Sequence, residues 1–309
     1  MIVDLVLVLA GLALLVFGGD LLVKGAVNLS LRIGLSPLVV GLTVVAFGTS
    51  APELMVSLSA ALKGSSDIAI GNVVGSNIAN VLLIVGTTAI VAVIPTKGHD
   101  LRESWTMMIA ATALVILLGF MGVIGRVQGV VLLVALFVVL WRQLTSGEDD
   151  AGAEDLEAVV LGARWLKIMF WLAGGLIGLP LGANLLVSGA SDIARLFGIS
   201  EAVIGLTLVA IGTSLPEMAA SIASALRGRA DMALGNVVGS NLFNLLAILG
   251  GTALVQPLPV PEQMLRLDMW VMLGSSLLLA PFLFRGIAVS RAVGAVFLAL
   301  YGAYLWALF

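Results

Sequence analysis

One polar motif occurs twice inside otherwise apolar segments of this chain. Residues 41–53 read GLTVVAFGTSAPE and residues 205–217 read GLTLVAIGTSLPE. A second motif follows each copy, GNVVGSNIAN at 71–80 and GNVVGSNLFN at 235–244. When 41–86 is aligned on 205–250 at an offset of 164, 27 of 46 positions are identical. Apolar packing does not require two carboxylates, two prolines and many Ser, Thr and Asn side chains. We therefore expect two half-sites that together bind something polar.

The composition predicts an all-α integral membrane protein. Of 309 residues, 61% are hydrophobic and 11% are charged, whereas ordinary soluble domains contain about 25% charged residues. The net charge of −3 is spread thinly, so no basic patch indicates nucleic acid. The absence of cysteine excludes disulfides and thiolate chemistry. The apolar run at 5–19 lacks a basic flank and a small-residue cleavage site, so we interpret it as a spanning helix and not a signal peptide.

Ten segments are long and apolar enough to cross a bilayer as helices, which takes about 20 residues each. They are 3–24, 37–62, 68–93, 104–122, 125–142, 164–186, 201–226, 232–255, 267–284 and 288–308. We expect a first five-helix repeat at 1–142, an acidic cytoplasmic linker at 143–163 and a second five-helix repeat at 164–309. Because five is odd, the second repeat must enter the membrane from the opposite side. Inverted repeats of this kind place the substrate near the midplane, on interrupted helices.

The distribution of Lys and Arg predicts the orientation. With the N-terminus outside, 11 of the 15 basic residues fall on the cytoplasmic side. Because cytoplasmic loops are enriched in Lys and Arg, we expect both termini outside.

The first motif offers hard oxygen ligands around a broken helix. Thr49 and Ser50 lie four and three residues before Glu53, a spacing that shares one helix face. Pro52 has no N–H, so carbonyls near Gly48 lose their partner, and free carbonyls at membrane depth are tolerated where they line a cavity. Carboxylate, hydroxyl and carbonyl oxygens suit Ca²⁺ and Na⁺.

The second motif repeats this set, and the following helices add polar residues at four-residue spacing. Thr213, Ser214 and Glu217 are the counterparts of the first set. We favour a ligand role for Ser76, Asn80, Ser240 and Asn244. For the amides of Asn72, Asn77, Asn236 and Asn241, small-residue packing seams and ion binding are both open.

Glu53 and Glu217 are the strongest candidates for function. An ionised carboxylate in the middle of a spanning helix costs about 2.5–3.5 kcal/mol on insertion scales. No Lys or Arg occurs in 33–62 or 196–226. One Ca²⁺ would neutralise the two charges, and so would monovalent ions or protons, which provides a basis for exchange.

These paired motifs resemble the cation/calcium exchanger superfamily, in particular the prokaryotic sodium/calcium exchangers. The resemblance implies ten helices in inverted repeats, antiport by alternating access, and a prokaryotic plasma or inner membrane location. It implies that Glu53 and Glu217 centre the ion site, with the residues above and the carbonyls of Ala46 and Ala210. The first helix of each half is implied to slide as a gate. Some relatives, including potassium-dependent exchangers, carry Asp where this chain has Asn244, which argues against potassium co-transport.

We therefore predict an antiporter that exchanges Na⁺ for Ca²⁺ and extrudes Ca²⁺. We expect no enzymatic activity, no cofactor and no obligatory protein partner beyond the lipid bilayer. Proton/calcium exchange on the same fold is the nearest alternative, because glutamates serve both. A cation channel is a second alternative. An intramembrane hydrolase is a third, although no His or Lys base lies in the expected core.

Overall fold

The computed structural model describes residues 2–97, 101–146, 163–198 and 210–308. In the first half, the elements are α1 (Ile2–Ile33), α2 (Pro37–Val40), η1 (Gly41–Val45), α3 (Ala46–Thr49), α4 (Ala51–Leu62), α5 (Ser66–Ala79), η2 (Asn80–Val85), α6 (Gly86–Val91), α7 (Arg102–Gly119), β1 (Val123–Ile124) and α8 (Arg126–Ser146). The second half contains α9 (Trp165–Leu196), α11 (Ala210–Thr213), α12 (Leu215–Leu226), α13 (Ala230–Leu242), η5 (Phe243–Ile248), α14 (Leu249–Val255), β2 (Leu258–Pro259), η6 (Met264–Asp268), α15 (Met269–Leu277), α16 (Ala280–Arg285) and α17 (Arg291–Ala307). Elements named η are π-helices.

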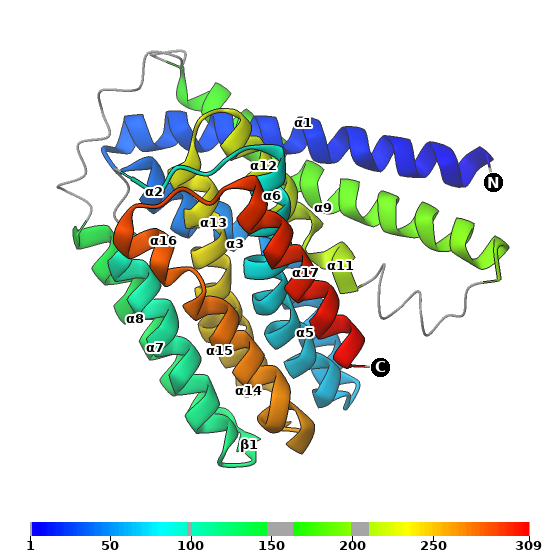
Figure 1. Ribbon diagram of the computed structural model, residues 1–309, viewed down its shortest axis with the longest axis vertical. Coiled ribbons are helices and arrows are strands. Elements are labelled where there is room, and N and C mark those ends of the chain that lie inside the picture. Colours follow the sequence, from blue (N-terminus) through cyan, green and yellow to red (C-terminus); the bar gives the residue numbers. More distant parts are fainter. Residues whose placement is uncertain (1, 98–100, 147–162, 199–209, 309) are drawn as a thin grey trace.

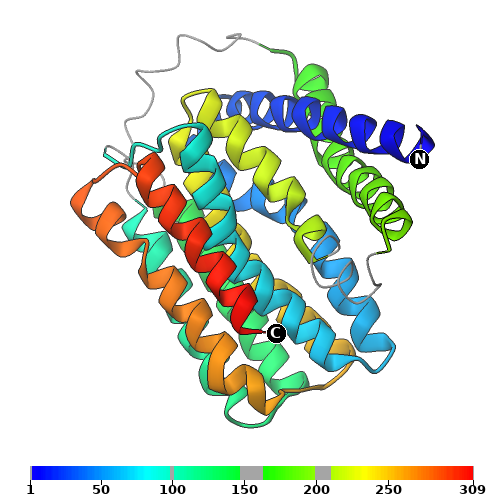
Figure 2. The ribbon, with the colours of Figure 1, turned by 45° about the vertical axis from the view of Figure 1, so that its right-hand side comes forward.

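The two long helices α1 and α9 lie side by side at one side of the bundle, where α1 also packs against α12 (Figure 1, Figure 2). Glycines line their contact at seven-residue spacing, and the two sets are offset by the same 164 residues as the motifs: Gly11, Gly18 and Gly25 in α1, and Gly175, Gly182 and Gly189 in α9. A Cβ placed at Gly11 would lie 2.6 Å from the backbone nitrogen of Leu186. Small residues at a helix contact permit this close backbone approach.

The core of the bundle consists of the continuous α5–η2–α6 and α13–η5–α14 helices. In their most apolar windows, 72% and 83% of the residues are buried, against 22% in α1. A helix that is apolar on all sides is stable only when other helices or lipid surround it. The two most buried helices therefore occupy the centre, and α1 is left largely to face lipid.

Two helices of the bundle are interrupted at the predicted break. Ser50 separates α3 from α4 with φ −82° and ψ 6°, and the two parts of this span differ in direction by 44°. Ser214 separates α11 from α12 with φ −86° and ψ 1°. In each case a proline follows at the second position of the next helix, where its missing N–H costs little. The sequence prediction of a broken helix at each motif is confirmed for these residues.

The described residues include seven helices long and apolar enough to cross a membrane, or eight if the bent pair Pro37–Thr49 and Ala51–Leu62 forms one span. Two shorter apolar helices, Leu215–Leu226 and Arg291–Ala307, also fall within predicted spans. The chain is thus an all-α, multi-pass membrane protein. The linker residues 147–162 and the start of the seventh predicted span, 201–209, lie outside the described residues.

The predicted ends of the first helix of each half were wrong. We expected these helices at 3–24 and 164–186, but α1 and α9 each have 32 residues and reach Ile33 and Leu196. The hydropathy falls at Lys24, yet α1 continues because Ala26 and Val27 beyond it are buried in a core cluster that includes Ile168 and Leu172 of α9.

Short antiparallel pairings connect loops of the two halves. β1 pairs with β2 through Ile124 and Leu258, and an isolated bridge joins Ile94 to Val289. Ile94 and Leu258 are separated by the offset of 164. α6 ends near the top of Figure 1 and α14 near the bottom, so the loops that follow them lie at opposite ends of the bundle.

Candidate ion-binding site

The two motif glutamates lie in the first turns of the helices that follow the breaks. Glu53 is the third residue of α4 and Glu217 is the third residue of α12. Each is only 1% exposed, and the two carboxyl groups are close enough to interact electrostatically. The first turn of a helix has unpaired N–H groups and a positive dipole end, which stabilise nearby negative charge. The helix breaks therefore direct two favourable helix ends toward one buried pair of carboxylates.

The hydroxyl groups of each half contact the glutamate of the other half. The Ser50 hydroxyl donates a hydrogen bond of 3.0 Å to Oε1 of Glu217, and Thr49 also interacts with that carboxyl group. In the mirrored arrangement, Thr213 and Ser214 lie beside the carboxyl of Glu53. Ser50 and Glu53 are three residues apart in sequence, but the break at Ser50 turns this hydroxyl toward the opposite half. The site is therefore assembled by both halves together.

Two asparagines hold the glutamate-bearing turns in place. Nδ2 of Asn72 donates to the Glu53 carbonyl at 3.1 Å and to the Ser57 hydroxyl at 2.9 Å. Nδ2 of Asn236 makes the equivalent bonds, at 3.1 Å to the Glu217 carbonyl and 3.0 Å to the Ser221 hydroxyl.

Asn236 also connects the halves, because its Oδ1 accepts a bond of 3.3 Å from Thr49. The sequence left both helix packing and ion binding open for Asn72 and Asn236. In the structure, the amide nitrogen of each one binds the backbone that carries a glutamate.

Several predicted ligands have buried oxygen atoms without a hydrogen-bond partner within the described residues. They are Oε2 of Glu53 and of Glu217, Oγ of Ser214 and of Ser240, and Oδ1 of Asn80 and of Asn244. Buried polar atoms are normally paired, and each exception requires an explanation such as a bound ion or water. These six oxygens are of the type that Ca²⁺ and Na⁺ prefer.

The two carbonyls among the predicted ligands differ in the hydrogen bonds that they already accept. The Ala46 carbonyl accepts bonds from the Ser50 amide at 3.0 Å and the Thr49 hydroxyl at 3.3 Å. The Ser214 amide instead bonds the carbonyl of Ile211 at 3.0 Å, not that of Ala210. Ser76 is 4% exposed on α5. An ion bound by the Ala46 carbonyl would therefore share an oxygen that already accepts the Ser50 amide bond, whereas the single Thr49 hydrogen can go either to this carbonyl or to Asn236 Oδ1.

A further set of amides lies next to the predicted ligands. Nδ2 of Asn80 donates to Oδ1 of Asn241 at 3.0 Å, and Nδ2 of Asn241 approaches the Asn77 carbonyl and the sulfur of Met108, both at 3.5 Å. Both side-chain polar atoms of Asn77 are buried and unpaired. The contact between Asn80 and Asn241 joins η2 to α13, so it fixes one predicted ligand to the opposite half.

The chemistry of the site is that of a hard-cation binder. Neither glutamate forms a salt bridge with any described Lys, Arg or His. A buried charge without a partner is costly, so the two carboxylates must be neutralised by cations or protons. No group of three His, Cys, Asp or Glu residues that could hold a metal occurs in the described part of the chain. A cation site at the two glutamates would also need hydroxyl, amide or carbonyl oxygens, as the sequence predicts.

Known proteins match this chain over its full length. The family described as "Sodium/calcium exchanger protein" matches residues 3–145 and again 167–309. The chain is 39% identical to "Putative antiporter CaxA" of Alkalimonas amylolytica, over 90% of this chain and 89% of that protein. It is 33% identical to "Sodium/calcium exchanger MaX1" of Methanosarcina acetivorans, over 99% of both.

A solved structure shows the same fold. A structure of the sodium-calcium exchanger NCX_Mj, soaked with zero Na⁺ and Ca²⁺, superimposes with a TM-score of 0.86. The two proteins are 34% identical, and the match covers 100% of this chain and 99% of that one. The resemblance inferred from the paired motifs is confirmed: this chain belongs to the sodium/calcium exchanger protein family.

Proposed function

We propose that this protein is a secondary antiporter that exchanges Na⁺ for Ca²⁺ by alternating access. Relatives named as sodium/calcium exchangers match nearly the whole chain. The observation that supports the proposal most strongly is the contact between Ser50 and Glu217, because it assembles one buried, carboxylate-based site from two halves.

The proposed architecture is ten membrane crossings in two inverted repeats, 1–142 and 164–309, joined by the acidic linker 143–163. The equal lengths of α1 and α9, the equal lengths of α4 and α12, and the shared glycine offset support it. We place the protein in the plasma or inner membrane of a prokaryotic cell with both termini outside. Where the Na⁺ gradient is directed inward, we expect the protein to extrude Ca²⁺ as Na⁺ enters.

The proposed ion ligands are the two glutamates and ten flanking oxygen donors. They are Glu53, Glu217, Thr49, Ser50, Thr213, Ser214, Ser76, Asn80, Ser240, Asn244 and the carbonyls of Ala46 and Ala210. Asn72 and Asn236 act as positioning residues, since they bond the backbone of the glutamates.

Charge balance provides the coupling between the two ions. One Ca²⁺ neutralises both carboxylates and can be replaced by monovalent ions, whereas an empty site leaves two buried charges unpaired. Because the empty site is costly, moving between the two open states without a cation is disfavoured. The protein therefore returns with Na⁺ after it releases Ca²⁺, and this requirement is the basis of exchange instead of leak.

The decisive experiment is ⁴⁵Ca²⁺ uptake into proteoliposomes loaded with Na⁺ and diluted into Na⁺-free buffer. We expect uptake that needs internal Na⁺ in the wild type, and none in Glu53→Gln or Glu217→Gln. Glu103→Gln is the matched control, because Glu103 pairs with Arg142 in a partly exposed position. Uptake driven only by a pH gradient would assign proton/calcium exchange, and unchanged uptake in folded Glu53→Gln would refute the proposed site.

A further inference from the structure

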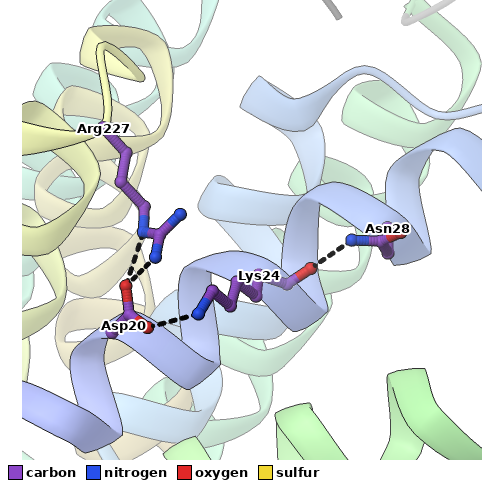
Figure 3. Close-up of polar contacts among 4 residues, drawn as sticks. All are labelled: Asp20, Lys24, Asn28 and Arg227. Atoms are coloured by element: carbon purple, nitrogen blue, oxygen red, sulfur yellow. Dashed lines mark hydrogen bonds and ion pairs between the residues drawn. The ribbon is translucent and has the colours of Figure 1, made fainter. Parts of the chain in front are cut away.

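One ion pair joins α1 to the turn between α12 and α13. Figure 3 shows Asp20 of α1 between Arg227 and Lys24. Nε of Arg227 donates to Oδ1 of Asp20 at 2.7 Å, and Nη2 of Arg227 contacts the same oxygen. Nζ of Lys24, one turn along α1, lies 2.8 Å from the other carboxylate oxygen. Both oxygens of Asp20 are thus paired, one within α1 and one with the bundle.

The helices α1 and α9 pack more extensively against each other than against the bundle. Their glycine seam brings the backbones into contact, as at Gly182, where a Cβ would lie 2.9 Å from the Gly11 carbonyl oxygen. At one end, Arg32 of α1 donates to the Ala163 carbonyl at 3.0 Å and lies over the Trp165 ring. Alternating access requires one group of helices to move against another. Because α1 and α9 contact each other more extensively than either contacts another helix, this pair is the group that can move against the rest.

The pair is attached to the bundle asymmetrically in this structure. α1 packs along α12, where a Cβ at Gly19 would lie 3.0 Å from the Ala219 carbonyl oxygen. The symmetry-equivalent contact would be α9 along α4, but α9 does not pack along α4 to a comparable extent among the described residues. The structure is therefore one of two conformations that an inverted repeat can adopt, and the other one exchanges the roles of α1 and α9.

The residues of the ion pair have no matching pair in the other repeat. At the offset of 164, the counterpart of Arg227 is Lys63, which caps the C-terminus of α4 as Arg227 caps α12. The counterpart of Asp20 is Asn184 in α9, and the counterpart of Lys24 is Ser188. When α9 takes the place of α1 against α4, a neutral amide meets Lys63. One conformation gains an ion pair and the other does not.

We propose that the Asp20–Arg227 ion pair is a one-sided latch that favours the conformation seen here over the opposite-facing one. This inference rests on the proposed alternating-access function. With side-chain exposures of 35% for Asp20 and 37% for Arg227, the pair is partly solvated and its contribution is modest. Exposed pairs of this kind change an equilibrium by about 1.4- to 5-fold. The latch thus adjusts the resting population of the two states without preventing the transition.

The test uses pulsed EPR distances between α1 and the bundle. The chain has no cysteine, so spin labels at Val6→Cys in α1 and Met121→Cys beyond α7, both exposed, report their separation directly. In reconstituted protein without Na⁺ or Ca²⁺ gradients, we expect two distances, one of which matches this structure. Asp20→Asn, which copies the α9 residue, should lower the weight of that distance by up to about 5-fold.

Asn184→Asp provides the opposite change. It places a carboxylate where Lys63 can pair with it, so it should raise the weight of the other distance. Glu103→Gln removes a different interhelical ion pair, between α7 and α8, and should leave both weights unchanged.

Folded Asp20→Asn and Asn184→Asp proteins whose weights stay at the wild-type values, or move in the same direction, would overturn the latch. A single distance in all variants would overturn it as well. These distances do not depend on Ca²⁺ flux, so failure of the proposed transport function would be seen separately in the proteoliposome assay.

Discussion

Removing the Ser50 hydroxyl should weaken Ca²⁺ binding without unfolding the protein. Its hydrogen bond to Glu217 is 3.0 Å long, and both residues are at most 3% exposed. A hydrogen bond to a charged group contributes about 1.5–3 kcal/mol. Ca²⁺ binding needs the ionised carboxylate, so Ser50→Ala should raise the Kd for Ca²⁺ by about 10- to 150-fold.

Thermal unfolding with and without Ca²⁺ measures this change apart from transport. At 100 times the wild-type Kd, bound Ca²⁺ stabilises the wild type by about 2.7 kcal/mol, and a 100-fold weaker variant by about 0.4 kcal/mol. The Ca²⁺-induced rise in Tm should therefore nearly disappear in Ser50→Ala.

The matched control is Ser30→Ala, because Ser30 is equally buried but donates to the Val27 carbonyl of its own helix at 2.8 Å. A Ca²⁺-induced rise in Tm that is as large in Ser50→Ala as in Ser30→Ala would show that the contact across the halves does not support ion binding.

Three further changes test separate parts of the structure. Ser240→Ala removes a buried hydroxyl that has no partner, so the ion-free Tm should be unchanged or higher while half-maximal uptake needs more Ca²⁺. Asn236→Ala removes the two bonds that its amide donates to the Glu217 carbonyl and the Ser221 hydroxyl, each of which contributes about 0.5–1.5 kcal/mol, so Tm and the initial uptake rate should both fall. Gly182→Leu places side-chain atoms against the α1 backbone; overpacking of this kind costs about 1–3 kcal/mol of unfolding free energy or more, so Tm should fall.

Ser240→Ala and Gly182→Leu each have a control in the same chain, and Asn236→Ala has a counterpart in the other half. Ser224→Ala removes a hydroxyl that donates to the Ala220 carbonyl at 2.8 Å, so it should lower the ion-free Tm but not the Ca²⁺ requirement. Asn72→Ala should resemble Asn236→Ala. Gly302→Leu adds a side chain where a Cβ meets open space and should be tolerated. A Ser240→Ala protein with wild-type Ca²⁺ dependence, or Gly182→Leu with wild-type Tm, would contradict the reasoning.

The membrane class and the position of the site could be predicted from sequence because they depend on composition and repetition. Burying Glu53 and Glu217 without a basic partner is costly in any fold, so their presence in both copies indicates function. The helix breaks at Ser50 and Ser214 follow from Pro52 and Pro216 through the missing N–H.

Other features could not be predicted because they depend on tertiary packing. Local spacing places Ser50 on the face of Glu53, but only the arrangement of the two halves shows that its hydroxyl reaches Glu217. The roles of Asn72 and Asn236 depend on which backbone carbonyl each amide meets. The π-helical segment that contains Asn244 has no signal in its residue types. The length of α1 was underestimated because the burial of Ala26 and Val27 against α9 depends on tertiary packing that a hydropathy pattern does not record.

The crossed contacts between hydroxyls and glutamates have a thermodynamic consequence. Because each half completes the other, the proposed ligands offer similar oxygens to an ion that enters from either face of the membrane. Nothing in that set distinguishes an inward from an outward passage. The exchanger is thus a reversible machine, and the sign of net Ca²⁺ movement is determined by the Na⁺ and Ca²⁺ gradients and the membrane voltage.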